Sequence, residues 1–212
     1  MKKNWRNHLA TVIVIIFGAV LFYVGTDGFH AFTKESARIY ALSQTQPHVP
    51  DVLLEDSKKR EYRFSEFEGK YVLATFIYTN CTTVCPVLET NFLEVYEQIP
   101  EEYLGNELNF LTISFDPEND DPETLETYRK HFNSDGETWR MARINQEDEL
   151  QTLLDTLEVV VIPDGEGDFS HNVAFYLFNP DGYLEEIYDF DDIEGTAKGV
   201  IEKVEKHAGR VK

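Results

Sequence analysis

Apolar side chains along the 212-residue chain gather in short runs that are separated by polar turns. Two of these runs, Tyr71–Tyr78 and Leu108–Phe115, are continuous and rich in β-branched and aromatic residues. Such runs are typical of strands that are buried on both faces of a sheet. The segment Trp139–Ile144 predicts a third strand. We therefore expect a sheet at the core of the protein.

Between and after these strands, apolar residues recur three and four positions apart, which predicts amphipathic helices. The four sets are Leu88, Phe92, Val95, Tyr96 and Ile99; Leu125, Tyr128 and Phe132; Leu150, Leu153, Leu154 and Leu157; and Ala197, Val200, Ile201 and Val204. Asp121, which precedes Pro122, is the expected N-cap of the second helix, and Asn145 is that of the third.

Two β-hairpins are predicted on either side of this core. Asp51–Glu55 and Glu61–Phe64 are short alternating runs around a polar turn. Val173–Phe178 and Tyr183–Tyr188 flank the sequence Asn-Pro-Asp-Gly at positions 179–182, which strongly favours a turn. The order of elements predicts an α/β protein with a central mixed sheet flanked by helices and an N-terminal β-hairpin, which is the order of a thioredoxin-like fold.

The N-terminus combines basic residues with a long apolar run. Lys2, Lys3 and Arg6 precede the uncharged segment from Leu9 to Gly25. We interpret residues 1–26 as one transmembrane helix and keep a cleaved signal peptide as the alternative. Positive charge stays on the cytoplasmic side. We therefore expect a single-pass protein of the cell membrane with a cytoplasmic N-terminus, a tether over 27–46 and an extracytoplasmic domain over 47–212.

The balance of charge narrows the choice of partners. The chain carries 39 Asp and Glu against 19 Lys and Arg, a formal net charge of −20. A surface this acidic repels phosphate groups, so nucleic acid and anionic lipid are poor partners.

The candidate chemistry lies in the only two cysteines, Cys81 and Cys85, at the predicted strand-to-helix turn. Residues four apart on a helix share a face, so the two sulfurs can meet each other or one metal ion. A bridge across so small a loop removes little entropy from the unfolded chain, which makes a purely structural disulfide a poor explanation. Pro86 is tolerated in a first turn, so the helix begins just before it, with Thr82 or Thr83 as the cap. We expect the helix N-terminus to favour the thiolate of at least one cysteine.

A third candidate, His171, follows the segment Pro163–Ser170, which is rich in Gly and Asp and is predicted to be a loop. In the expected fold this loop can approach the cysteine turn. Position alone leaves open whether His171 is a ligand or a surface residue.

Taken together, these features resemble the Sco/SenC family, the copper chaperones of cytochrome c oxidase assembly. The residues that carry the resemblance, from about Pro47 to the C-terminus, are Gly69-Lys70, Phe76-Ile77-Tyr78-Thr79-Asn80-Cys81 with Cys85-Pro86, Ser114-Phe115-Asp116-Pro117 with Asp120, and His171 before a strand ending in Asn179-Pro180-Asp181-Gly182.

The resemblance implies a thioredoxin-like domain that binds one copper ion, as Cu(I) or Cu(II), through Cys81, Cys85 and His171. Thiolates favour Cu(I) and imidazole also suits Cu(II). Asp116 matches the family's acidic motif. We expect it at most to contact the ligands, not to bind the metal itself. Copper binding needs the reduced cysteines and therefore excludes a Cys81–Cys85 disulfide. The implied partners are cytochrome c oxidase subunit II as copper acceptor and a thiol–disulfide reductant.

Three other functions remain open. The same cysteines can serve a thiol–disulfide oxidoreductase that acts on extracytoplasmic cysteines without His171. A thiol peroxidase is suggested by Thr82-Thr83-Val84-Cys85-Pro86, although the proline that peroxiredoxins place before this motif is absent. An anchored scaffold with an incidental disulfide is the third. Replacing His171 separates copper binding from reductase activity.

Overall fold

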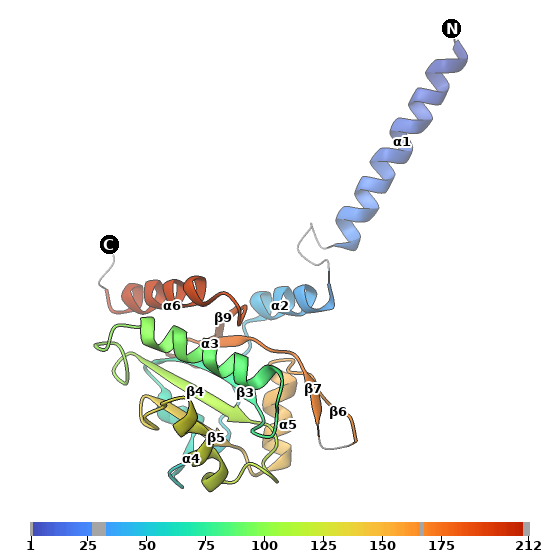
Figure 1. The fold of residues 1–212 in the computed structure, drawn as a ribbon. Helices are drawn as coiled ribbons and strands as arrows, with labels where there is room; N and C mark the ends of the chain where they lie inside the picture. Colours follow the sequence, from blue (N-terminus) through green and yellow to red (C-terminus); the bar gives the residue numbers. More distant parts are fainter. Residues whose placement is uncertain (1, 27–32, 166–167, 210–212) are drawn as a thin grey trace. The chain divides into compact units, whose positions relative to one another are not determined.

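The computed structural model describes residues 2–26, 33–165 and 168–209, and the chain divides into two compact units, residues 1–45 and 46–212. The first unit contains helices α1 (Lys2–Gly25) and α2 (Lys34–Thr45) (Figure 1). Within α1, Asn7–Gly25 is long and apolar enough to cross a membrane, with a mean hydropathy of 2.3. Helix α2 was not predicted, because its polar composition (KESARIYALSQT) shows no clear apolar stripe.

The second unit is built on a seven-stranded mixed sheet with the strand order β2-β1-β5-β4-β3-β8-β9. The strands are β1 (Leu53–Asp56), β2 (Glu61–Arg63), β3 (Tyr71–Ile77), β4 (Leu108–Ser114), β5 (Trp139–Arg143), β8 (Phe175–Phe178) and β9 (Leu184–Tyr188). The pairs β3–β4 and β4–β5 are parallel, and the other neighbours are antiparallel. Every residue of β3 and β4 is buried, as their continuous apolar runs predicted.

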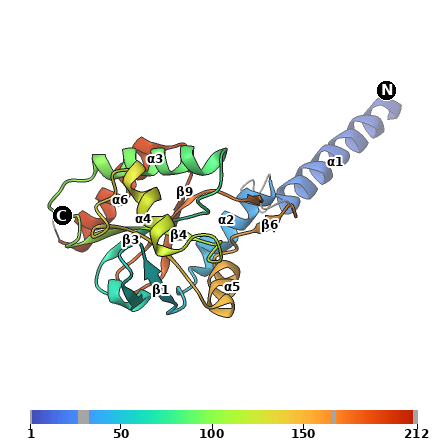
Figure 2. The same cartoon turned by 60° about the horizontal axis from the view of Figure 1, so that its bottom comes forward.

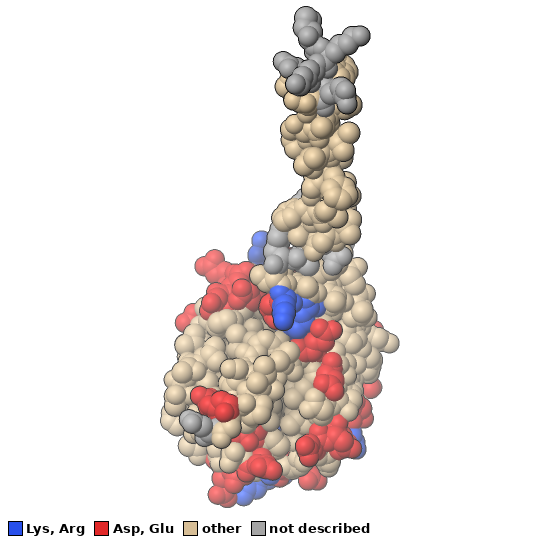
Figure 3. Space-filling view, turned by 90° about the vertical axis from the view of Figure 1, so that its right-hand side faces the viewer, with Lys and Arg blue, Asp and Glu red and all other residues tan. Residues whose placement is uncertain are grey.

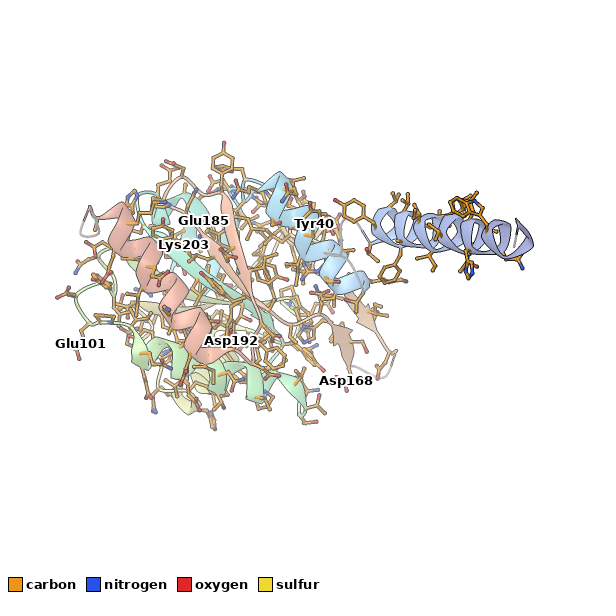
Figure 4. The ribbon with its side chains drawn as sticks, turned by 90° about the horizontal axis from the view of Figure 1, so that it is seen from above. Tyr40, Glu101, Asp168, Glu185, Asp192 and Lys203 are labelled. Atoms are coloured by element: carbon orange, nitrogen blue, oxygen red, sulfur yellow. The ribbon has the colours of Figure 1, made fainter. Side chains whose placement is uncertain are left out.

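Helices cover both faces of this sheet, which confirms the predicted fold class. They are α3 (Val84–Gln98), α4 (Pro122–His131), α5 (Glu147–Thr156) and α6 (Ile193–His207), with a 3-10 turn at Phe64–Phe67. Helices α3 and α6 pack together on one face, and α5 lies on the other (Figure 2). Lys203 ties α6 to β9 through an ion pair of 2.9 Å with Glu185, and Asp192 caps the start of α6 (Figure 4).

Two local predictions need correction. Asn145 is not the N-cap of α5: Gln146 holds that position, and the Asn145 amide instead donates to Glu55 at 2.8 Å. Asp121 does cap α4, accepting from the Thr124 N–H at 2.8 Å.

The second correction concerns the segment Pro163–Ser170, which was predicted to be a loop. Its two ends belong to β6 (Val161–Pro163) and β7 (Phe169–His171), which pair antiparallel as a separate two-stranded sheet. Strands of three residues are too short to show an alternating pattern, so no periodicity predicted them. His171 is thus the last residue of β7, paired with Val161.

The fold determines where the candidate site lies. Strands β3, β4 and β5 run parallel, so their carboxyl ends meet at one edge of the sheet. The cysteine turn follows β3 at this edge, and the loop with Asp116 and Asp120 follows β4. Residues about 40 apart in sequence are therefore brought together there.

Candidate metal centre

The cysteines occupy the turn between β3 and α3. Cys81 precedes the helix and Cys85 lies in its first turn; both are buried, at 5% and 0% exposure, and both are free thiols. The Cys85 backbone N–H donates to Cys81 Sγ at 3.3 Å. Thr83 is the N-cap, but its side chain makes no capping bond, and its Oγ1 lies 3.7 Å from Cys81 Sγ instead. The Thr83 hydroxyl thus contacts the Cys81 sulfur instead of capping the helix.

These surroundings make the two thiols unlike. Burial raises the pKa of Cys81, but hydrogen bonds from the backbone N–H groups of Cys85 and Thr83 more than offset it, so the pKa of Cys81 is lowered overall. Burial also raises the pKa of Cys85, and the neighbouring Cys81 and Glu89 add to the rise. Cys81 is therefore the more acidic and nucleophilic thiol.

His171 faces the cysteines from β7. Its Nε2 lies 3.6 Å from Cys85 Sγ, and its Nδ1 lies 3.1 Å from the carbonyl oxygen of Asn172. A carbonyl only accepts, so Nδ1 carries the proton and Nε2 presents a lone pair to the sulfur. Burial lowers the pKa of His171, which favours the neutral imidazole that binds metals. The structure therefore brings together the three residues predicted from sequence.

Aromatic rings hold the histidine in place. The His171 ring packs against Phe115 and Tyr78, with centroids 5.0 and 6.2 Å away. Phe169, two residues earlier, contacts the same two rings at 5.5 and 5.0 Å. The imidazole thus lies at the edge of an apolar cluster, with its Nε2 directed toward Cys85.

The two aspartates at the end of β4 have different roles. The buried Asp120 carboxylate accepts from the Thr79 N–H at 3.0 Å, from the Thr79 hydroxyl and from the Ser114 hydroxyl, and it ties the cysteine turn to β4. Burial raises the pKa of Asp120. The Asp116 carboxylate instead accepts from the Asn119 amide at 2.9 and 3.0 Å. That Asp116 supports the ligands without binding the metal itself stays a prediction.

Glu89 is the residue that the sequence analysis missed. It is fully buried four positions after Cys85, and its Oε1 accepts from the Thr112 hydroxyl at 3.0 Å. Its Oε2 has no hydrogen-bond partner among the described residues, and burial raises the pKa of Glu89 to about 8. The signal was available: Glu89 is an acidic residue directly after Leu88, on the side of the helix that also carries Phe92.

Two of the three candidate ligands, Cys85 and His171, already lie at the separation that one ion requires. A nitrogen at about 2.0 Å and a sulfur at about 2.3 Å from a tetrahedral ion lie about 3.5 Å apart. The observed separation of His171 Nε2 and Cys85 Sγ is 3.6 Å. Among the described residues, no three His, Cys, Asp or Glu side chains already surround a common metal position. Binding would therefore require the Cys81 sulfur to turn from the Cys85 N–H toward the other two ligands.

The fold and the site together define a thioredoxin-like protein with two cysteines and one histidine at the carboxyl edge of its sheet. Comparison with known proteins agrees with this class. The model of the SCO1/SenC family matches residues 41–209, and the chain belongs to that family.

Curated relatives and solved structures are similar to the same region. The chain is 28% identical over 131 residues to the SCO1 protein homolog of Bacillus subtilis, covering 61% of this chain and 66% of that one. It is 25% identical over 179 residues to the human mitochondrial SCO2 homolog, covering 82% and 65%. The matches thus span just under two thirds of these relatives.

Two solved structures show the shared fold. A SCO1/SenC family lipoprotein of Bacillus anthracis superimposes with a TM-score of 0.68 at 23% identity, covering 77% of this chain and 96% of that one. Bradyrhizobium japonicum ScoI, solved with copper bound, gives a TM-score of 0.63 at 22% identity, covering 74% and 99%.

Proposed function

We propose that this chain is a copper-binding protein, anchored in the cell membrane with its domain outside the cytoplasm, that delivers copper to, or prepares, the dinuclear copper site of cytochrome c oxidase subunit II. The observation that carries the proposal is the approach of His171 Nε2 to Cys85 Sγ, beside Cys81. Family membership and the names of the relatives support copper as the cargo.

The chain's own residues would divide the work as follows. Cys81, already the more acidic thiol, offers the first sulfur, and the neutral His171 offers Nε2. Cys85 must lose its proton, which its burial resists, so copper supplies the driving force for its ionisation. Three ligands leave a position open, so that an acceptor's cysteines can displace the donor's one at a time. A Cys81–Cys85 disulfide would block loading until a reductant opens it.

The membrane part of the proposal rests on residues 7–25. Their length and apolar composition suit a span, and the basic residues before them favour a cytoplasmic N-terminus. We propose residues 1–26 as the anchor, 27–46 as the connection and 47–212 as the copper-binding domain.

The test is a copper titration of the reduced full chain in detergent, beside Cys81→Ser, Cys85→Ser and His171→Ala. We expect stoichiometric binding with a sulfur-to-copper charge-transfer band in the native chain. Each variant should lose at least about a hundredfold in copper affinity, since each removes a direct ligand. Mutating residues that only hydrogen-bond to a ligand already lowers metal affinity about 10–100-fold. Equal, weak binding by all four proteins would refute the proposal.

A second candidate, a thiol–disulfide oxidoreductase, is favoured by the asymmetry of the cysteines. A more acidic, more exposed Cys81 beside a buried, protonated Cys85 suits a nucleophile and a resolving thiol. His171→Ala separates the two functions, because it should abolish tight copper binding and leave disulfide reduction within about twofold. Loss of both activities in a folded variant would contradict this division.

A further inference from the structure

A groove opens beside the candidate metal centre, between α5 and the end of β4. It encloses about 1060 Å³, including the open solvent at its mouth. The β6–β7 sheet, which carries His171, contributes Val161, Pro163 and Phe169 to the same groove. All lining residues belong to the unit formed by residues 46–212.

The floor of the groove is apolar and reaches solvent. Phe115, Leu150 and Leu154 keep 6–7% of their surface exposed, whereas Leu153, on the same helix as the two leucines but outside the groove, is completely buried. Beside this floor, Val161 and Phe169 are half-buried and Pro163 is exposed. Apolar surface left open in a groove gains free energy when a partner covers it.

The rim of the groove is acidic. Asp116, Glu118 and Glu147 line it, and no Lys, Arg or His does so among the residues described. The cation behind the groove, Arg143, is already engaged by the Pro117 carbonyl at 2.7 Å and by Glu55 at 2.8 Å. Figure 3 shows one side of the molecule, where the charged side chains of the folded unit are mainly Asp and Glu. The carboxylates on the rim are therefore available to pair with cations that a partner supplies.

The groove is connected to the candidate ligand through two rings. Phe115 and Phe169 line the groove, and both belong to the aromatic cluster around His171. The Phe115 ring contacts the His171 ring at 5.0 Å. A segment lying in the groove would thus touch the rings that position the imidazole.

We propose that this groove docks the copper-accepting protein through a short segment in which apolar side chains alternate with Lys or Arg. The apolar side chains would cover Val161, Pro163 and Phe169, and the cations would pair with Glu118 and Glu147. The inference rests on the proposed function, because it names the surface by which an acceptor reaches the same site. Rim charges of this kind mainly accelerate encounter and select partners.

The test uses the full chain, reduced and free of copper, in detergent micelles. The probe is a fluorescein-labelled peptide of alternating Lys, Phe and Leu residues, with two controls in which Glu replaces Lys or Ser replaces Phe and Leu. Anisotropy should show binding of the first peptide only, weakening with salt. Glu118→Lys with Glu147→Lys should reduce the affinity roughly tenfold, equivalent to about 1.4 kcal/mol. The matched control is Glu97→Lys with Glu101→Lys, on exposed positions outside the groove, which should stay within about twofold.

Three outcomes would overturn the proposal. If both double variants weaken peptide binding equally, the peptide is attracted by the overall negative charge and not by the groove. If the acidic peptide binds equally well, the rim carboxylates do not select the partner. A dimer of the native chain that the Glu118/Glu147 variant does not form would show that the groove is filled by a second copy.

The dependence on the proposed function is tested separately. Both double variants should bind copper as the native chain does, but copper transfer to the soluble domain of an oxidase subunit II should slow roughly tenfold only in the Glu118/Glu147 variant, in line with its docking loss. Absence of copper binding in the native chain would refute the proposed function. The peptide experiment would still show whether the groove binds a basic, apolar segment.

Discussion

The two halves of the candidate centre are supported by different sheets. Cys81 and Cys85 follow β3, an inner strand of the seven-stranded sheet, which is paired along its length with β4 and joined on its other side to β8. His171 ends β7, which pairs only with the three residues of β6 among the described strands. One half of the site is therefore part of the core, and the other is attached to it.

The attachments of the histidine half are few. The Val160 N–H donates to Asn172 Oδ1 at 2.8 Å, and the Phe169 N–H approaches the Tyr78 hydroxyl at 3.4 Å. The Asn172 amide also donates to the Glu158 carbonyl oxygen at 3.4 Å, and the rings of Phe115, Phe169 and His171 pack together. Under the proposed function only metal binding needs β7 in place, so we expect that dithiol chemistry and metal binding can be disturbed separately.

The largest expected effect is on the cysteine half, through pH. The pKa of Glu89 is raised from 4.5 to about 8, so the folded protein retains a proton that the unfolded chain releases between these values. The stabilising contribution of Glu89 is fully present below pH 4.5 and is lost as pH rises toward 8, by at most about 1.4 kcal/mol per pH unit. Glu89→Gln should remove this contribution to the pH dependence of urea unfolding. Glu94→Gln, exposed on the same helix, should retain it, and an unchanged slope in Glu89→Gln would contradict the assignment.

The next effect tests how firmly the core holds the cysteine turn. Asp120→Ala leaves the Thr79 and Ser114 groups without their buried acceptor, so it should lower the free energy of unfolding by about 3 kcal/mol. Asp120→Asn keeps one carbonyl acceptor and should lose less. Denaturant titration measures both changes. Equal losses, or none, would mean that the turn is held by other contacts.

A smaller effect is expected in the histidine half. Asn172→Ala removes the acceptor of the Val160 N–H and should weaken copper binding roughly tenfold, if the lost hydrogen bond of about 1–1.5 kcal/mol positions His171. The alkylation pKa of Cys81 should not change. Asn145→Ala, which removes an exposed hydrogen bond to Glu55, is the control. A shifted Cys81 pKa in Asn172→Ala would show that the two halves are not independent.

The smallest effect concerns one hydroxyl. Thr83→Val removes the contact of 3.7 Å to Cys81 Sγ and leaves the backbone N–H donors, so the pKa of Cys81 should rise by a few tenths of a unit. The pH dependence of alkylation measures it. Thr82→Val, its exposed neighbour, should leave the value unchanged; a similar rise in both would assign the effect to hydrophobicity.

The sequence by itself determined the elements whose patterns are long. Continuous apolar runs identified β3 and β4, and spaced leucines identified α5, because strands buried on both faces and helices with one buried stripe impose these periods. The motif around Cys81 and Cys85, with His171, indicated the family. Local chemistry also placed the cap of α4 at Asp121.

Only the tertiary structure decided the features that depend on neighbours distant in sequence. The three-residue strands β6 and β7 are stabilised by each other and by the aromatic cluster, so no local period reveals them. The unlike pKa values of Cys81 and Cys85 arise from different burial and hydrogen bonding at positions one helical turn apart. The raised pKa of Glu89 likewise results from burial against the sheet. Burial and long-range contacts exist only in the folded chain. The sequence could therefore predict which residues are candidate ligands, whereas their distances and pKa shifts depend on the tertiary structure.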